Sequence, residues 1–204
     1  EEQLVLALNW VREYCGCPGA ESSDWATESD CFEAGLETAE ILADLHMGVP
    51  CLLAGLLYRI VREERATLDA VRERFGDTVA RLLEGALRMA AISDLRSTGD
   101  RPVLGQAQAQ RENIRQMLVA LVDDVRVALI KLAERTAAIR AVRKDSDRCH
   151  AIAGEVFDVY APLAHRLGIG HLKWELEDLS FRFLYPDAYR KIAALLDGKR
   201  LERD

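Results

Sequence analysis

Apolar residues recur three and four positions apart along most of this chain, and this spacing constrains the fold more than any other feature. Leu4, Leu8 and Val11 are an early example, and residues 52–60 are a denser one. Such spacing places apolar side chains on one face of a helix, whereas the alternation with period two that is typical of strands is almost missing. The sequence therefore predicts an all-α protein.

Turn and capping residues divide this pattern into about ten helices. Residues 16–19 combine glycine and proline and end the first helix, and Gly48 and Pro50 separate the second from the third. We expect helices over residues 3–14, 32–46, 50–64, 68–75, 77–93, 112–121, 125–142, 145–160, 172–184 and 186–196. Residues 97–110 are polar and have no core-facing periodicity, so we expect a mobile loop there.

Charge and apolar content narrow the classes of function. The 204 residues include 27 Lys and Arg against 34 Asp and Glu, a formal net charge of −7. A surface that binds nucleic acid needs an excess of clustered cations, so we expect no direct nucleic-acid binding. The longest apolar run, 51–58, is far shorter than the roughly 18 residues of a membrane span, and no signal peptide begins the chain. We therefore expect a cytoplasmic protein without a membrane partner.

Short motifs add little. The sequence contains no Walker, GxGxxG, HExxH or GxSxG pattern. Its five cysteines have no CxxC spacing, which predicts neither a zinc site nor a disulfide framework, and only Cys15 and Cys17 are close enough in sequence to suggest an oxidation artefact. Spacing alone thus leads no further than an acidic helical domain.

One long run resembles a known family. Residues 160–186, YAPLAHRLGIGHLKWELEDLSFRFLYP, closely resemble the segment that joins the hydrolase and synthetase domains of RelA/SpoT alarmone enzymes. The runs AEILADLHM at 39–47, NIRQML at 113–118 and ALIKLAER at 128–135 agree. The resemblance implies an HD-superfamily helical domain at 1–160 and connector helices at 161–204. These connector helices would lead toward a synthetase domain that lies outside this chain.

The resemblance also implies where a metal would be bound. Hydrolytic members of this family hold one Mn²⁺ through two histidines and two aspartates, and the metal activates the water that removes the 3′-pyrophosphate of ppGpp. By the same resemblance, these ligands fall on Ala34, Tyr58, Arg59 and Glu134. Only one of the four positions keeps a carboxylate. The resemblance therefore predicts a degenerate centre that has lost its Mn²⁺ and needs no other cofactor.

Neighbouring family positions are altered as well. The catalytic Glu-Asp pair falls on Arg62 and Glu63, which reverses the charge at the first position. The cationic run that cradles the nucleotide falls on residues 25–28, and the His-Asn pair downstream falls on Ala137 and Ala138. We therefore expect no hydrolase activity from this chain.

Loss of the hydrolase site is the pattern of the RelA branch of GTP pyrophosphokinases. This resemblance implies a parent protein that transfers pyrophosphate from ATP to GTP or GDP in the stringent response, regulated by this domain. The expected partner is the synthetase domain of the same protein, contacted through connector residues that include Arg166 and Trp174. Ribosomes and uncharged tRNA would be contacted only through parts outside this chain.

Two alternatives remain open at this stage. Arg59, Arg62, Lys131 and Arg135 form a cationic set that would bind the phosphates of (p)ppGpp, GTP or GDP without hydrolysing them, as a sensor. Against this, Glu134, Glu63 and Asp124 would pair with these cations and fill the former metal cavity. Asp123 and Asp124 also directly precede the helix expected from Val125, which predicts capping of that helix. The second alternative is weak residual hydrolysis by Glu63 and Glu134 alone.

Overall fold

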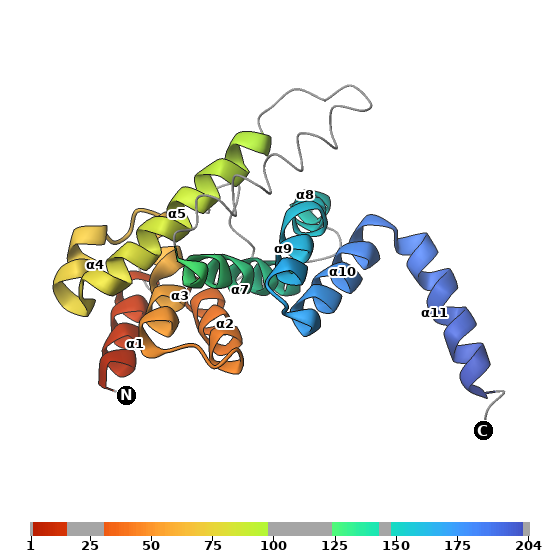
Figure 1. The fold of residues 1–204 in the computed structure, drawn as a ribbon, viewed down its shortest axis with the longest axis horizontal. Coiled ribbons are helices and arrows are strands. Elements are labelled where there is room, and N and C mark those ends of the chain that lie inside the picture. The colour runs from red at the N-terminus through yellow and green to blue at the C-terminus, as the bar shows by residue number, and fades with distance from the viewer. Residues whose placement is uncertain (1, 16–30, 98–123, 143–147, 202–204) are drawn as a thin grey trace. The chain divides into compact units, whose positions relative to one another are not determined.

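The computed structural model describes residues 2–15, 31–97, 124–142 and 148–201, and these residues are almost entirely helical (Figure 1). The all-α prediction is confirmed. The expected loop at 97–110, the expected helix at 112–121 and the cradle positions 25–28 lie almost wholly outside the described residues. The chain forms two compact units, residues 1–141 and 142–204, and each is described by itself.

The first unit contains six described helices. They are α1 (Glu2–Cys15), α2 (Cys31–Asp44), α3 (Val49–Arg62), α4 (Leu68–Phe75), α5 (Asp77–Ser97) and α7 (Val125–Ala141). Each begins and ends within a few residues of the range expected from the sequence. α2 ends two residues earlier than expected because the chain turns at His46, which has a positive φ of 56°.

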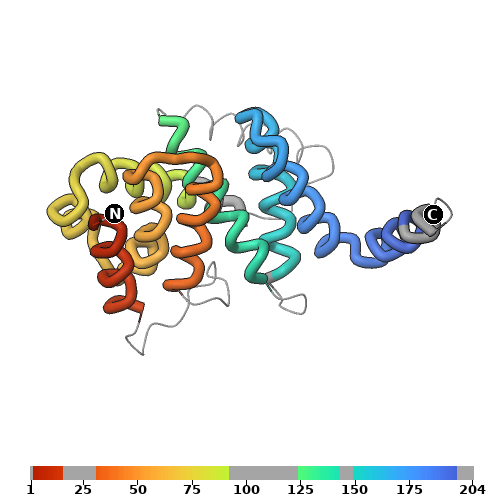
Figure 2. Tube along the Cα trace, turned by 90° about the horizontal axis from the view of Figure 1, so that it is seen from below, coloured from red at the N-terminus to blue at the C-terminus, as the bar shows by residue number. Residues whose placement is uncertain are grey.

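Helix α3 is the centre of the first unit. It packs against α1, α2, α5 and α7, and every residue from Leu53 to Val61 is buried. The helices α1, α2 and α3 run side by side (Figure 2). A helix that is apolar around its whole circumference must be surrounded by other helices. Tyr58 and Arg59 are exceptions to that apolar pattern, so this core encloses polar groups.

Two glycines bring α2 and α3 unusually close together. A Cβ atom at Gly35 would lie 2.6 Å from the carbonyl oxygen of Leu56, and one at Gly55 would lie 2.6 Å from Cδ1 of Leu42. Real side chains do not fit at such distances, so the helix spacing depends on both glycines. The close approach narrows the space between α2 and α3 in which the candidate site lies.

The second unit is built from α8 (Arg148–Glu155), a π-helical turn η1 (Val156–Tyr160), α9 (Ala161–Arg166), α10 (Gly170–Leu184) and α11 (Pro186–Leu201). α8, η1 and α9 follow one another without a break, and α10 packs against all three. The chain reverses before α10 at Gly168, whose φ is +76°. The domain boundary expected at 160/161 falls inside this helical run, and it stays a prediction.

None of the helices in the described ranges combines the length and the apolar character that crossing a bilayer requires.

Candidate functional site

The positions matched to the family's metal ligands lie together around one small cavity. The cavity has a volume of about 20 Å³ and lies between α2, α3 and α7. Its walls include all four former ligand positions: Ala34 from α2, Tyr58 and Arg59 from α3, and Glu134 from α7. A space of this size holds about one water molecule. Among the described residues, the enclosed part of the cavity is therefore far smaller than a nucleotide.

Further lining residues come from the same helices. Gly35, Gly55, Arg135, Ala137 and Ala138 complete most of the wall, and Thr38 closes it from α2. Thr38 Oγ1 donates a hydrogen bond to the carbonyl oxygen of Ala34 at 2.7 Å. Sequence reasoning missed Thr38 and Gly55 as site residues. The glycine inside an apolar helix was the one available signal for Gly55, whereas nothing in the sequence distinguishes Thr38.

Glu134 provides the carboxylate of this cavity, and both its oxygens accept hydrogen bonds. Lys131 Nζ donates to Oε2 at 2.6 Å, and Arg135 donates from Nε to Oε2 at 2.9 Å and from its terminal nitrogen to Oε1. All three side chains are buried, Lys131 to the point that only 1% of its surface is exposed. The three side chains thus form a buried group in which two cations surround one carboxylate.

Electrostatics keep this carboxylate ionised. Burial by itself would raise the pKa of Glu134, but the positive charges of Arg135 and Lys131 and their hydrogen bonds outweigh burial and hold that pKa well below its usual range. A buried ion is tolerated when it is paired and its lone pairs are satisfied. Lys131 and Arg135 supply the positive charge that keeps the buried carboxylate paired.

Tyr58 connects α3 to this charged group. Its hydroxyl oxygen accepts hydrogen bonds from Arg62 Nη1 at 2.9 Å and from Lys131 Nζ at 3.0 Å. Burial opposes the charge of Arg62, but Tyr58 and Glu134 outweigh burial and raise the pKa of the Arg62 guanidinium. Tyr58 therefore fills the space beside the cavity and orients Arg62 and Lys131.

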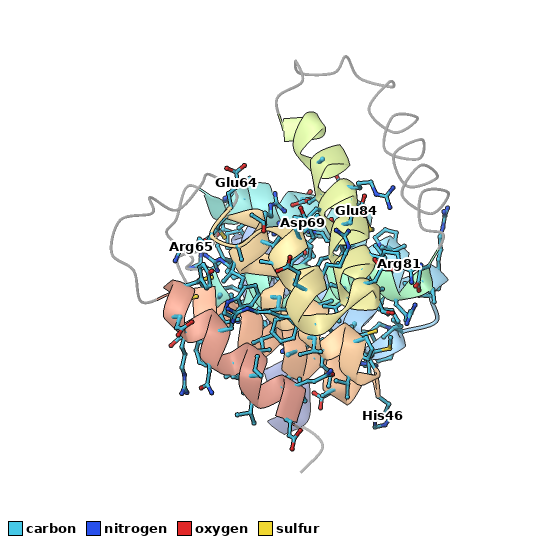
Figure 3. All side chains as sticks on the ribbon, turned by 90° about the vertical axis from the view of Figure 1, so that its left-hand side faces the viewer. His46, Glu64, Arg65, Asp69, Arg81 and Glu84 are labelled. Atoms are coloured by element: carbon cyan, nitrogen blue, oxygen red, sulfur yellow. The ribbon has the colours of Figure 1, made fainter. Side chains whose placement is uncertain are left out.

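Arg59 is held by a second set of ion pairs. Its Nε lies 2.9 Å from Oε1 of Glu63, and Oε2 of Glu63 lies 2.7 Å from Nε of Arg65. Arg65 Nη1 also donates a hydrogen bond to the carbonyl oxygen of Tyr14 at 3.1 Å. Figure 3 shows Arg65 beside the end of α1. Glu63 is not among the residues that line the cavity. It joins α3 to α1 through Arg65.

Of the two sequence predictions for Asp124, capping is confirmed and pairing with the cations of the cavity is wrong. Asp124 does not pair with the cations of the cavity but with Arg126, whose Nε lies 2.9 Å from its carboxylate. Its Oδ1 also accepts a hydrogen bond from the backbone N–H of Arg126 at 3.0 Å, at the start of α7. Asp124 and Glu134 are ten positions apart, which corresponds to about 15 Å along a helix. Asp124 therefore caps the start of α7 and lies far from Glu134.

The donor set does not fit a divalent metal ion. Among the described residues that line the cavity, Glu134 is the only carboxylate, and its oxygens already accept hydrogen bonds from two cations. All four histidines of the chain are exposed, and Figure 3 shows His46 pointing outward from the end of α2. Within the described ranges, no group of three or more His, Cys, Asp and Glu side chains is arranged to hold a metal.

The two connector residues lie in the other unit. Arg166 ends α9 and is exposed, and Trp174 lies on α10 with 72% of its surface exposed. The structure thus gathers the predicted metal and anion positions in the first unit and leaves Arg166 and Trp174 on the surface of the second. The roles predicted for these residues stay predictions.

Known proteins identify the family to which this arrangement belongs. The sequence profile of the HD domain family matches residues 7–170. The GTP pyrophosphokinase of Escherichia coli K12 is 44% identical over 98% of this chain, and that of Haemophilus influenzae is 42% identical over all of it. This chain is a RelA/SpoT-family HD domain. The HD domain spans about a quarter of the length of these relatives, 26% and 27% respectively.

Two further comparisons describe how far the similarity extends. The GTP pyrophosphokinase of Photobacterium angustum is 45% identical over 83% of the HD domain and 23% of its own length. A solved structure of a metazoan SpoT orthologue, described as hydrolysing ppGpp, superposes with a TM-score of 0.56 over 89% of this chain and 95% of that one. Its sequence identity is 15%, so this likeness concerns the fold alone. The expected HD-like helical fold is confirmed.

Proposed function

We propose that this HD domain does not hydrolyse (p)ppGpp and instead regulates the synthetase of a GTP pyrophosphokinase of which it is a part. One observation carries the first half of the proposal. At the cavity where the matched ligand positions meet, Glu134 is buried and held by Lys131 and Arg135. A carboxylate neutralised in this way is a poor ligand for a second cation.

Simple electrostatics support the loss of the metal. A divalent ion about 4 Å from one guanidinium is repelled by roughly 8 kcal/mol at an effective dielectric constant of about 20. That energy equals the free energy of binding at about micromolar affinity. Arg59 and Arg135 both line the cavity. Without a metal, the attacking water has an unlowered pKa, and the leaving pyrophosphate has no Lewis acid to neutralise its charge.

The regulatory half of the proposal rests on the relatives and on the second unit. The relatives named above are GTP pyrophosphokinases about four times as long as this chain. Trp174 on α10 presents a large aromatic side chain to solvent, and Leu195 and Leu196 on α11 of the same unit are exposed as well. We infer that this unit contacts the synthetase domain in the cytoplasm. Ribosomes and uncharged tRNA would contact other parts of the protein.

The sensor alternative is not favoured by the geometry. A cavity of about 20 Å³ admits about one water, and Arg59, Arg62, Lys131 and Arg135 each make a hydrogen bond to an internal acceptor. Binding of a nucleotide there would require α2 and α3 to separate.

Calorimetric titration of ppGpp into the purified chain with Mn²⁺ present tests the loss of hydrolysis. We expect a flat trace and no release of pyrophosphate, with a ppGpp-hydrolysing SpoT orthologue as the positive control. Sustained heat from turnover would overturn the proposal. A saturable isotherm without turnover would instead support the sensor, and charge reversal of Arg59 should then abolish it.

The regulatory role is tested separately in the full-length protein. Trp174→Ala should change the rate of ppGpp synthesis several-fold without altering any substrate-binding residue. Leu6→Ala is a matched control, because Leu6 is also an exposed apolar residue but lies on α1 of the first unit. An unchanged synthesis rate and ribosome response in Trp174→Ala would count heavily against regulation through this surface.

A further inference from the structure

The hydroxyl group of Tyr58 lies between two cationic side chains. Its oxygen accepts one hydrogen bond from Arg62 at 2.9 Å and another from Lys131 at 3.0 Å. Lys131 Nζ also lies 4.8 Å from the centre of the Tyr58 ring. Only 1% of the surface of Tyr58 is exposed, so this residue is shielded from bulk water. Tyr58 also belongs to the wall of the cavity between α2, α3 and α7.

The proton of this hydroxyl group needs an acceptor of its own. A tyrosine hydroxyl has one proton to donate, and neither a guanidinium nor an ammonium group can accept it. Among the described residues, the hydrogen bonds of Tyr58 are the two from Arg62 and Lys131, and in both its oxygen is the acceptor. Two cations that donate to the oxygen also polarise the O–H bond and make it a stronger donor. Because a buried donor without an acceptor is costly, an acceptor is expected beside Tyr58.

The cavity provides space for an acceptor of atomic size. Its volume of about 20 Å³ corresponds to about one water molecule, and a halide ion is only slightly larger. Arg59 and Arg135 are among the residues that line it, and guanidinium groups bind anions through charge-assisted hydrogen bonds. Glu134 lines it as well, but this carboxylate accepts hydrogen bonds from Lys131 and Arg135. These two cations weaken its repulsion of a nearby anion.

We propose that the cavity binds one halide ion, chloride above all, which accepts a hydrogen bond from the Tyr58 hydroxyl and is attracted by Arg59 and Arg135. Water is the competing occupant, because it also accepts a proton, but it must find acceptors for its own two protons. Among the described side chains that line the cavity, these are Thr38 and Glu134, and Glu134 already accepts from two cations. A halide needs donors alone. This site does not depend on whether the domain regulates a synthetase.

A chloride titration at constant ionic strength tests the site. The whole 204-residue chain is melted in mixtures of sodium chloride and sodium gluconate, which keeps the screening of surface charges the same. We expect Tm to rise by about 3–6 °C when chloride reaches ten times its dissociation constant, and logarithmically beyond that concentration. Crystals soaked in bromide should show the anomalous signal of bromide inside the cavity. A Tm that is independent of chloride, or a cavity that holds a water molecule only, would overturn the proposal.

Variants assign the chloride effect to this cavity. Tyr58→Phe keeps the ring and removes the O–H donor, so it should raise the dissociation constant for chloride by about tenfold or more. Tyr14→Phe is the matched control, because Tyr14 is a half-buried tyrosine of the same unit that does not line the cavity, and its affinity should be unchanged. If Tyr58→Phe does not fold, Ala34→Leu fills the cavity from a half-buried position and should abolish the chloride dependence. An unchanged chloride dependence in either cavity variant would place the ion elsewhere and refute this site.

Discussion

Two groups of ion pairs in the first unit have similar chemistry and opposite surroundings. On α4 and α5, Arg72 pairs with Asp69 and Asp77 at 2.6 and 3.3 Å, and these side chains are between 43% and 85% exposed. On α7, Lys131 and Arg135 pair with Glu134 at similar distances, but all three are buried. When one partner of the exposed group is lost, water solvates the remaining charge at little cost in free energy. In the buried group, no water is present to replace a lost partner. Burial, more than distance, decides what an ion pair contributes.

The largest effect should follow from breaking the buried group. Glu134→Gln removes the negative charge and leaves Lys131 and Arg135 as neighbouring buried cations. Removing one partner of a buried ion pair costs about 3–5 kcal/mol of unfolding free energy. Urea unfolding of the variant and the parent chain measures this loss. A loss below about 1 kcal/mol would mean that water reaches the pair, and the contrast between the two groups would fail.

Acid should weaken the same group. The pKa of Glu134 in the folded chain lies below its unfolded value of about 4.3. As the pH falls, the unfolded chain therefore protonates this carboxylate at a higher pH than the folded chain does. The stabilisation from Glu134 is therefore present above about pH 5 and is lost as the pH falls through the folded pKa. Stability measured from pH 7 to pH 3 should fall less steeply in Glu134→Gln than in the parent chain. Parallel curves would show that other carboxylates account for the acid dependence.

A smaller loss should follow from widening the gap between α2 and α3. A Cβ atom at Gly35 would lie 2.6 Å from the backbone oxygen of Leu56, so Gly35→Ala must push the helices apart at a cost of about 1–3 kcal/mol. Gly154→Ala is the matched control, because Gly154 lies in α8 and a Cβ atom added there would have no neighbouring atom within 4 Å. That variant should be neutral or more stable by up to about 1 kcal/mol. Equal effects on Tm would refute the importance of close packing around the cavity.

The smallest effect should come from the exposed group. Asp69→Asn removes one partner of Arg72, which keeps Asp77 as a second partner and remains in contact with water. We expect a change in unfolding free energy of about 0–1 kcal/mol, and salt should reduce it further. Urea unfolding of the variant and the parent chain at low and at high salt measures this change in unfolding free energy. A loss as large as that of Glu134→Gln would remove the distinction between the two groups.

Local patterns predicted much of the fold. The expected helix at residues 68–75 coincides with α4, whose cap is Thr67, and the helix expected from Asp77 begins there. These elements depend on capping groups and apolar spacing within a few residues, which the sequence displays directly. The π-helical turn at Val156–Tyr160 was not foreseen, because no local residue pattern distinguishes it from an α-helix.

The candidate site was predictable in its positions and not in its interactions. The family resemblance identified Ala34, Tyr58, Arg59 and Glu134, and all four line one cavity. It did not reveal that Lys131 reaches Tyr58, a partner 73 positions away in sequence. Capping by Asp124 at the start of α7 was predicted from the sequence, because a carboxylate just before an expected helix start accepts from the first backbone N–H groups.

The sequence by itself determined the helical class, most helix ends and the loss of ligand-type residues at the matched positions, because these depend on residue identity and near neighbours. Tertiary structure decided which charges are buried and which helices approach each other through Gly35 and Gly55. Those features arise where helices distant in sequence pack together. The same glutamate would be an ordinary surface charge on an exposed helix, and only the packing of α2, α3 and α7 makes its two cations necessary.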